Sequence, residues 1–204
     1  MRRRAFILAL ALSAFALVPG LAQDTYQEEA DRLAVLLDWR PGSVVAEIGA
    51  GEGQMTLTAA KRVGTEGRVY TTELDTKKLA HLEKLARKEK NITAVQAAVA
   101  QTNLPAACCD SIFMRLVYHH LTKPAEIDAS LFRSLKPGGL LAVIDEEPQP
   151  GSSRVEGVPE NRGGHGIPQK ILIEELTAAG FQLVKVHNDW PSDEYCVIFR
   201  KPSP

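Results

Sequence analysis

The sequence predicts an α/β fold of the doubly wound kind, with a mostly parallel, seven-stranded sheet that ends in a C-terminal antiparallel hairpin. Short apolar runs alternate with amphipathic helical segments along most of the 204 residues, which is typical of a parallel sheet with helices on both faces. The last two predicted strands, 181–189 and 194–201, are separated by only four residues. So short a link requires an antiparallel pair, because a parallel crossover needs about a dozen residues or more. The length and the 45% hydrophobic content fit one domain.

The first 22 residues are predicted to be a signal peptide. MRRR is a positively charged start, AFILALALSAFALVPGLA is an uncharged apolar run, and Gly20 and Ala22 fit a small-residue cleavage site before Gln23. The alternative is an uncleaved membrane anchor, because the apolar run is nearly long enough to span a bilayer. We therefore expect a domain at 23–204 that is periplasmic or secreted.

In the first half of the domain, β-branched runs predict strands and spaced leucines predict helices. Pro41 and Gly42 end the first helix, and Asp75 is suited to cap a later one. The predicted elements are a helix at 26–37, a strand at 43–48, a helix at 56–62, a strand at 67–74, a helix from Asp75 to about Lys88 and a strand at 91–98.

In the second half, proline and glycine mark the element boundaries. Pro124 and Pro168 each open a helix, Gly180 closes the second one, and LKPGG at 135–139 is predicted to be a helix stop and turn. Strands are predicted at 110–117 and 140–145. Residues 146–166 are rich in proline, glycine and charge, which indicates a long functional loop.

The stretch EIGAGEG places three glycines just after the first predicted strand. A dinucleotide site requires GxGxxG, but Gln54 stands where the third glycine is needed, and Gly53 comes one residue early. Glu47, two residues before Gly49, would also repel a pyrophosphate. A cationic, phosphate-free nucleotide such as S-adenosylmethionine fits better, because its ammonium suits a carboxylate and its carboxylate suits a helix N-terminus.

Glu73 ends the second predicted strand, 22 residues beyond Gly51. A carboxylate in this position can accept hydrogen bonds from both hydroxyls of a ribose. Dinucleotide folds use the same arrangement, so Glu73 alone does not distinguish the two ligands.

Five segments together resemble the class I S-adenosylmethionine-dependent methyltransferases. They are AEIGAGEG, VYTTELD, NLPAACCDSIF, LVYHHL and LKPGGLLAVID, and the resemblance covers roughly residues 27–201. More narrowly, the chain is similar to a group of small, exported, single-domain members that carry the same YHH and ID segments. The resemblance implies a methyltransferase, with S-adenosylmethionine as cofactor and the Rossmann-like methyltransferase fold.

The resemblance also implies roles for individual residues. Ala98 stands where the family usually has an acidic residue near adenine, so recognition there would fall to the backbone of Ala98 and Val99. Arg115 and Leu116 would lie beside the methionine tail and the methyl group. The implied cofactor-binding residues are Glu47, Gly49, Ala50, Gly51 and Gly53 for the methionine part, Glu73 for the ribose, Leu74, Ala98 and Val99 for the adenine, and Arg115.

His119 and His120 are the predicted catalytic residues. They follow the fourth predicted strand, and imidazole titrates near neutral pH, so either could deprotonate or orient an acceptor. The alternative is that one histidine only packs or caps, and Tyr118 is equally ambiguous. Asp145 ends the fifth predicted strand and either lines the substrate cleft or begins a solvated loop. His165 lies in a glycine-rich segment, for which a surface loop is favoured over a lid.

Charge and cysteine content narrow the partners. With a formal net charge of −1 and no basic stripe beyond the first four residues, nucleic acid is not expected, and a small-molecule acceptor is. No zinc-like cysteine spacing is present, so no metal site is predicted. Cys108 and Cys109 leave open an arsenite methyltransferase, and a pairing with Cys196 is also open. A non-catalytic exported binding domain and an NAD(P)-dependent oxidoreductase remain as alternatives, and the sequence does not address oligomeric state.

Overall fold

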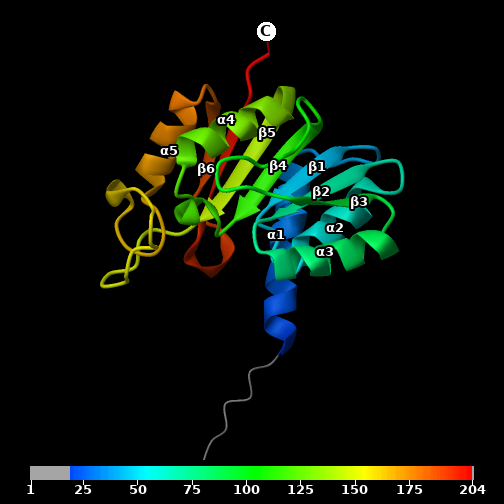
Figure 1. The fold of residues 1–204 in the computed structure, drawn as a ribbon, viewed down its shortest axis with the longest axis horizontal. Coiled ribbons are helices and arrows are strands. Elements are labelled where there is room, and N and C mark those ends of the chain that lie inside the picture. The colour runs from blue at the N-terminus through cyan, green and yellow to red at the C-terminus, as the bar shows by residue number, and fades with distance from the viewer. Residues whose placement is uncertain (1–18, 204) are drawn as a thin grey trace, which may run out of the picture.

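The computed structural model describes residues 19–203, and its helices and strands alternate as predicted (Figure 1). The strands are β1 (Val44–Ile48), β2 (Arg68–Glu73), β3 (Ile92–Gln96), β4 (Cys109–Arg115), β5 (Leu135–Asp145), β6 (Gln182–His187) and β7 (Tyr195–Arg200). The α-helices are α1 (Pro19–Leu36), α2 (Gln54–Val63), α3 (Thr76–Lys88), α4 (Pro124–Ser134) and α5 (Gln169–Ala178). Short 3-10 helices lie at Tyr118–His120, Glu160–Arg162 and Pro191–Asp193.

The seven strands form one sheet in the order β3-β2-β1-β4-β5-β7-β6. Pairing is parallel from β3 to β5, whereas β7 runs antiparallel to both β5 and β6. The predicted α/β class, the seven-stranded sheet and the terminal antiparallel hairpin are therefore confirmed. The strand order reverses between β1 and β4, and ligands of open α/β sheets bind beyond the carboxyl ends of the strands at this place.

Helices cover both faces of the sheet. Ala30 and Leu33 of α1 and Ala59 of α2 pack on one face, and Leu131 of α4 and Leu172 of α5 pack on the other. In Figure 1, α1, α2 and α3 accordingly lie together on one side of the sheet, and α4 and α5 lie on the other. Both faces of the central strands are buried, which explains why their sequences read as continuous apolar runs rather than alternating ones.

Local chemistry accounts for most of the element boundaries. The side chain of Asp75 accepts hydrogen bonds from the backbone N–H groups of Lys77 and Lys78, so the predicted N-cap of α3 is confirmed. LKPGG was expected to be a turn; α4 does end there, but the segment belongs to β5, and the β4–β5 register shifts between Cys109 and Ser111. The glycines therefore form an irregular strand start rather than a free turn.

The predicted signal peptide falls mostly outside the described residues, which begin at Pro19. The position expected for cleavage, before Gln23, lies within α1, which begins seven residues earlier than the predicted start of the helix at residue 26. Within 19–203, no helix combines the length and the apolar character needed to cross a bilayer.

Candidate active site at the sheet switch point

A cavity of about 440 Å³ opens beyond the carboxyl ends of β1, β2 and β4, at the reversal of strand order. It is bounded by the turn after β1, the end of β2, the segment after β3 and the segment after β4. Its lining residues are Ile48, Gly49, Thr72, Glu73, Leu74, Lys78, Ala97, Ala98, Val99, Arg115, Leu116, Val117, His120, Leu121, Thr122 and Ile127. Seven predicted site residues lie here together: Gly49, Glu73, Leu74, Ala98, Val99, Arg115 and His120.

The glycine-rich turn needs its glycines for conformation and for close packing. Gly49, Gly51 and Gly53 all have positive φ, between 55° and 80°, where other residues are strained. A Cβ on Gly49 would come within 2.6 Å of the Val117 side chain, whereas a Cβ on Gly51 would meet nothing within 4 Å. The backbone at Gly51 is therefore open to an approaching ligand.

Glu73 holds this turn against the end of β2. Its carboxylate accepts hydrogen bonds from the backbone N–H groups of Gly51 at 3.0 Å, Leu74 at 2.8 Å and Asp75 at 3.1 Å. Each carboxylate oxygen can accept more than one hydrogen bond, and Glu73 lines the cavity. With three of its about four acceptor sites taken, the side chain keeps about one site for a hydroxyl of a sugar.

Glu47 does not line the cavity, which corrects its predicted role in binding the methionine part of the cofactor. It is 5% exposed, and its carboxyl is hydrogen-bonded to the Thr56 hydroxyl, which lies 2.9 Å from the Thr71 hydroxyl. Burial raises the pKa of Glu47 to about 8, against the lowering effect of Thr56. Glu47 is therefore mainly protonated at neutral pH, and it braces the turn instead of supplying negative charge to a ligand.

The opposite wall of the cavity is apolar. Leu74 and Val99 are about half exposed although they are large hydrophobic residues, and both line the cavity. The backbone N–H and C=O of Ala98 are already bonded to Gln101, so backbone recognition of a base would fall to Val99. The buried hydroxyl of Thr72, which also lines the cavity, has no hydrogen-bond partner in the described residues.

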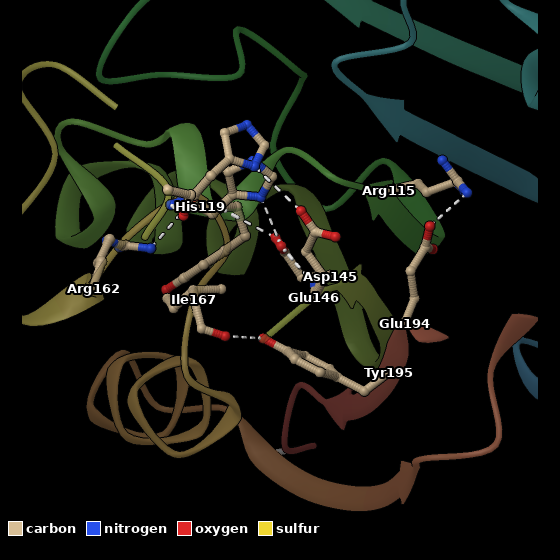
Figure 2. Close-up of polar contacts among 11 residues, drawn as sticks. Arg115, His119, Asp145, Glu146, Arg162, Ile167, Glu194 and Tyr195 are labelled. Carbon is tan, nitrogen blue, oxygen red and sulfur yellow. Dashed lines mark hydrogen bonds and ion pairs between the residues drawn. The ribbon is translucent and has the colours of Figure 1, made fainter. Parts of the chain in front are cut away.

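Arg115 lines the cavity at the end of β4, but its guanidinium is held from behind. It donates to Glu29 of α1 at 2.6 Å and to Glu194 at 2.7 Å, and Figure 2 shows Arg115 facing Glu194. Burial alone would lower the pKa of Arg115, but the hydrogen bond and charge of Glu29 together with Glu194 hold it above its ordinary value. Arg115 thus contributes a fixed positive charge, and two of its five N–H donors are bonded to these carboxylates.

The two predicted catalytic histidines occupy different environments. His119 is 2% exposed, and its Nδ1 lies 2.7 Å from Asp145 at the end of β5, which also accepts from the His119 backbone N–H (Figure 2). His120 is exposed and lines the cavity. Burial first, and then the neighbouring histidines, lowers the pKa of His120, so it is neutral at pH 7 and able to accept a proton.

Tyr118 has a structural role. It is fully buried, and its hydroxyl lies 2.9 Å from Asp128 and 3.0 Å from Glu175. One hydroxyl proton cannot serve two carboxylates. Burial raises the pKa of Asp128 to about 7, so a protonated Asp128 can donate to the Tyr118 oxygen while Tyr118 donates to Glu175.

The loop at 146–166 is anchored beside the histidines, a feature that sequence patterns did not reveal. Arg162 is fully buried and donates to the Tyr118 carbonyl at 3.0 Å and to Glu175 at 2.7 Å. This anchor brings His165 to within 4.4 Å of His119 and 5.3 Å of His120, between ring centroids. No local signal could reveal these contacts, because His165 lies 46 positions beyond His119 and 45 beyond His120 in the sequence.

The cysteines lie away from the cavity. Cys108 and Cys109 are at the start of β4, opposite its Arg115 end, and Cys196 is buried in β7; all three are free thiols. The arsenic hypothesis is therefore not supported, because thiolates at the wrong end of the strand cannot hold an acceptor beside the cavity. Cys196 is in register with Ile144, which pairs with Arg115, so it lies at the opposite end of the sheet from Cys108 and Cys109 and is not paired with either in this structure.

The strand order, the glycine-rich turn after β1 and the acidic end of β2 define a class I S-adenosylmethionine-dependent methyltransferase fold. Residues 46–143, just under half of the chain, match the family model described as a methyltransferase domain. A crystal structure of an S-adenosylmethionine-dependent methyltransferase from Aquifex aeolicus shares the fold, with a TM-score of 0.73 at 20% identity, over 90% of this chain and 94% of that one.

Curated relatives match a shorter region. The ubiquinone/menaquinone biosynthesis C-methyltransferase of Marinomonas sp. is 31% identical over 109 residues, which is 52% of this chain and 43% of the relative. The tRNA (adenine(58)-N(1))-methyltransferase of Thermus thermophilus is 29% identical over 123 residues, 59% of this chain and 46% of the relative. The chain thus spans less than half the length of these relatives.

The cavity fits S-adenosylmethionine, the methyl donor of this family. Gly51 leaves open space over the backbone, Glu73 has free acceptor capacity, and Leu74 and Val99 expose apolar surface for adenine. The unpartnered Thr72 hydroxyl is a further polar group that a ligand can satisfy. These residues would hold the cofactor. Glu47, Gly53 and His119 do not line the cavity and stabilise the segments that do.

Proposed function

We propose that this chain transfers a methyl group from S-adenosylmethionine to a small-molecule acceptor. The observation that carries the proposal is the single cavity that joins the nucleoside-binding residues Glu73, Leu74 and Val99 to His120. One end of the cavity suits an adenosine, and the other presents an imidazole that is neutral at pH 7.

When bound, the cofactor supplies an electrophilic methyl group. The main contribution of the chain would be to hold the methyl donor and the acceptor in the reactive geometry, since this positioning accounts for much of the rate acceleration in such reactions. His120 would accept the proton of an acceptor hydroxyl, thiol or amine on its ring nitrogen. His119, locked by Asp145, fixes the backbone from which His120 projects.

A small acceptor is favoured over nucleic acid by the local charge. Asp145 ends β5, and Glu146 and Glu147 follow it beside the histidine segment. Carboxylates in this position repel phosphate groups. The overall charge of −1 provides no compensating basic surface.

We further propose that the chain is exported. The charged start, the apolar run and the small-residue site before Gln23 support export to the periplasm or beyond. Fractionation of cells that express the full chain, with N-terminal sequencing of the recovered protein, tests this proposal. A product that keeps its first residues in the cytoplasmic fraction would contradict it.

Calorimetry and turnover together test the proposed activity. We expect S-adenosylhomocysteine to bind with one site per chain, and labelled methyl from S-adenosylmethionine to appear in an acceptor from a panel of phenols, thiols and amines. Binding without turnover across the panel would favour a non-catalytic binding domain. Binding of NADH in place of S-adenosylhomocysteine would favour the oxidoreductase alternative.

A further inference from the structure

Three histidines from two distant segments converge at one edge of the cavity. His119 and His120 lie in the 3-10 helix after β4, and His165 lies in the anchored loop after β5. The ring centroids of His119 are 4.1 Å from His120 and 4.4 Å from His165. One ring nitrogen of each lies within 4.8 Å of the corresponding atoms of the other two.

The buried member of this cluster has a ring nitrogen without a hydrogen-bond partner. Nδ1 of His119 is bonded to Asp145, but Nε2 is buried and has no partner within the described residues. A buried, unpaired polar atom is costly, and most such atoms in folded proteins are satisfied. The ring of His120 is tilted against this histidine and the ring of His165 meets it edge-on, so ring nitrogens that could share an ion with Nε2 are nearby.

The carboxylates around the cluster are placed as they are around metal-binding histidines. Metal-ligating histidines commonly bond their second nitrogen to a carboxylate, which fixes the tautomer and the ring orientation. Here Asp145 lies 2.7 Å from Nδ1 of His119, and Glu146 lies 3.2 Å from Nδ1 of His165. Both contacts leave Nε2 as the free nitrogen of the ring.

The geometry needs only a small adjustment to hold an ion. Zinc–nitrogen bonds of 2.0–2.1 Å in a tetrahedral site place ligand nitrogens roughly 3.4 Å apart. Because His120 and His165 are exposed side chains, each can turn inward, whereas His119 is fixed. Two exposed ligands also leave one side of the ion open toward solvent and the cavity, an arrangement typical of catalytic rather than structural zinc sites.

We propose that His119, His120 and His165 form a binding site for a divalent transition-metal ion of the Zn²⁺ class, with Asp145 and Glu146 as the carboxylates that orient two of the ligands. Imidazole ligands suit Zn²⁺, Cu²⁺, Ni²⁺ and Fe²⁺, whereas Mg²⁺ and Ca²⁺ prefer oxygen ligands. The fourth position would receive an oxygen or sulfur of the methyl acceptor, which an ion activates by favouring its deprotonated form. This last role rests on the proposed function, and it would replace proton acceptance by His120, because the ion would occupy that ring nitrogen. The ion site itself does not rest on the proposed function.

Cobalt spectroscopy and zinc calorimetry on the tag-free, chelator-treated full chain test the site. We expect one Co²⁺ per chain with the visible absorption of a tetrahedral ion, and competition by one equivalent of Zn²⁺. His165→Ala should weaken Zn²⁺ binding at least 10-fold, and Asp145→Asn by about 10- to 100-fold. His81→Ala removes an exposed histidine of α3 and is the matched control, with no expected change.

Two results would overturn the proposal. One is the absence of bound Co²⁺ or Zn²⁺ in both the wild type and His81→Ala, in protein that unfolds cooperatively. The other is binding that persists in His165→Ala and in His120→Ala but disappears in Cys108→Ser, which would place the ion on the thiols. Because His165 and His120 are exposed, these variants test the site without removing the buried His119, and S-adenosylhomocysteine binding by the same variants reports separately on the proposed methyltransferase function.

Discussion

Glu73 shows how one side chain can serve both the fold and the ligand. It closes the glycine-rich turn through three backbone N–H groups while it lines the cavity. Its role in the turn does not prevent it from binding a ribose, because a carboxylate offers about four acceptor sites. The free chain therefore already has the turn in the conformation that a ligand requires.

Replacing Glu73 by Ala should weaken S-adenosylhomocysteine binding by about 10- to 100-fold, since hydrogen bonds to a charged group contribute about 1.5–3 kcal/mol. Isothermal titration measures the change. Glu66→Ala, on an exposed carboxylate before β2, should bind as the wild type does. Equal affinity in Glu73→Ala and Glu66→Ala would contradict a role of Glu73 in ribose binding.

Glu47 leads to a pH prediction. The folded chain keeps the proton on Glu47 up to pH about 8, whereas the unfolded chain releases it near 4.5. Between these values the unfolded state binds fewer protons, so the free energy of unfolding falls as pH rises, by about 1.4 kcal/mol per pH unit from this group. Glu47→Gln removes this contribution.

Urea denaturation at several pH values between 5 and 8 measures this effect. The free energy of unfolding of Glu47→Gln should increase relative to that of the wild type as pH rises. If the new amide packs differently from the carboxyl, the free energy of unfolding changes by the same amount at every pH. Such a change does not alter the pH dependence of the difference between variant and wild type. Glu66→Gln serves as the exposed control and should run parallel to the wild type. A Glu47→Gln curve that is also parallel to the wild type would show that Glu47 is ionised in the folded chain at these pH values.

At the scale of elements, local chemistry predicted most of the structure. Apolar β-branched runs identified the strands, Asp75 identified the start of α3, and a four-residue link required the terminal hairpin. Sequence patterns gave wrong predictions where a contact with a residue distant in the sequence determines the local structure. LKPGG joins β5 because β4 lies beside it, and Glu47 turns inward toward Thr56 although its position after the apolar run resembles that of Glu73.

The candidate site was predicted in part for the same reason. The sequence placed Glu73, Leu74, Val99 and His120 near one cavity because parallel strands end at one edge of the sheet. It did not place His165, since the path of a long loop depends on its tertiary contacts. The buried Arg162 supplies that contact, and an arginine in a polar loop sequence gives no sign that it will be buried.

The Arg162 anchor should be essential to the loop. Arg162→Ala leaves the Tyr118 carbonyl without this donor and Glu175 with only the Tyr118 hydroxyl, and removing one partner of a buried ion pair typically costs about 3–5 kcal/mol. We expect a corresponding loss of stability in denaturant, with faster amide hydrogen exchange across 146–166. Arg154→Ala, an exposed arginine of the same loop, should change neither. Unaltered exchange in Arg162→Ala would show that other contacts hold the loop.

At the scale of the whole molecule, the cavity lies where the two halves of the sheet meet. The β1–β2–β3 side supplies Glu73, Leu74 and Val99, and the β4–β5 side supplies Arg115 and His120. A ligand that fills the cavity contacts both halves, and it loses all of these contacts when the chain unfolds. Ligand binding should therefore stabilise the chain as a unit.

S-adenosylhomocysteine at about 100 times its dissociation constant should raise the free energy of unfolding by about 2.7 kcal/mol. In thermal unfolding this corresponds to a rise in the midpoint temperature of roughly 5–10 °C for a chain of this size. The rise should follow the logarithm of ligand concentration and be smaller in Glu73→Ala at the same concentration. NADH should produce no shift, because the turn after β1 has Gln54 where a dinucleotide site requires its third glycine. An equal shift with NADH, or none with S-adenosylhomocysteine in a cooperatively folded chain, would exclude the assignment of this cavity to a methyl donor.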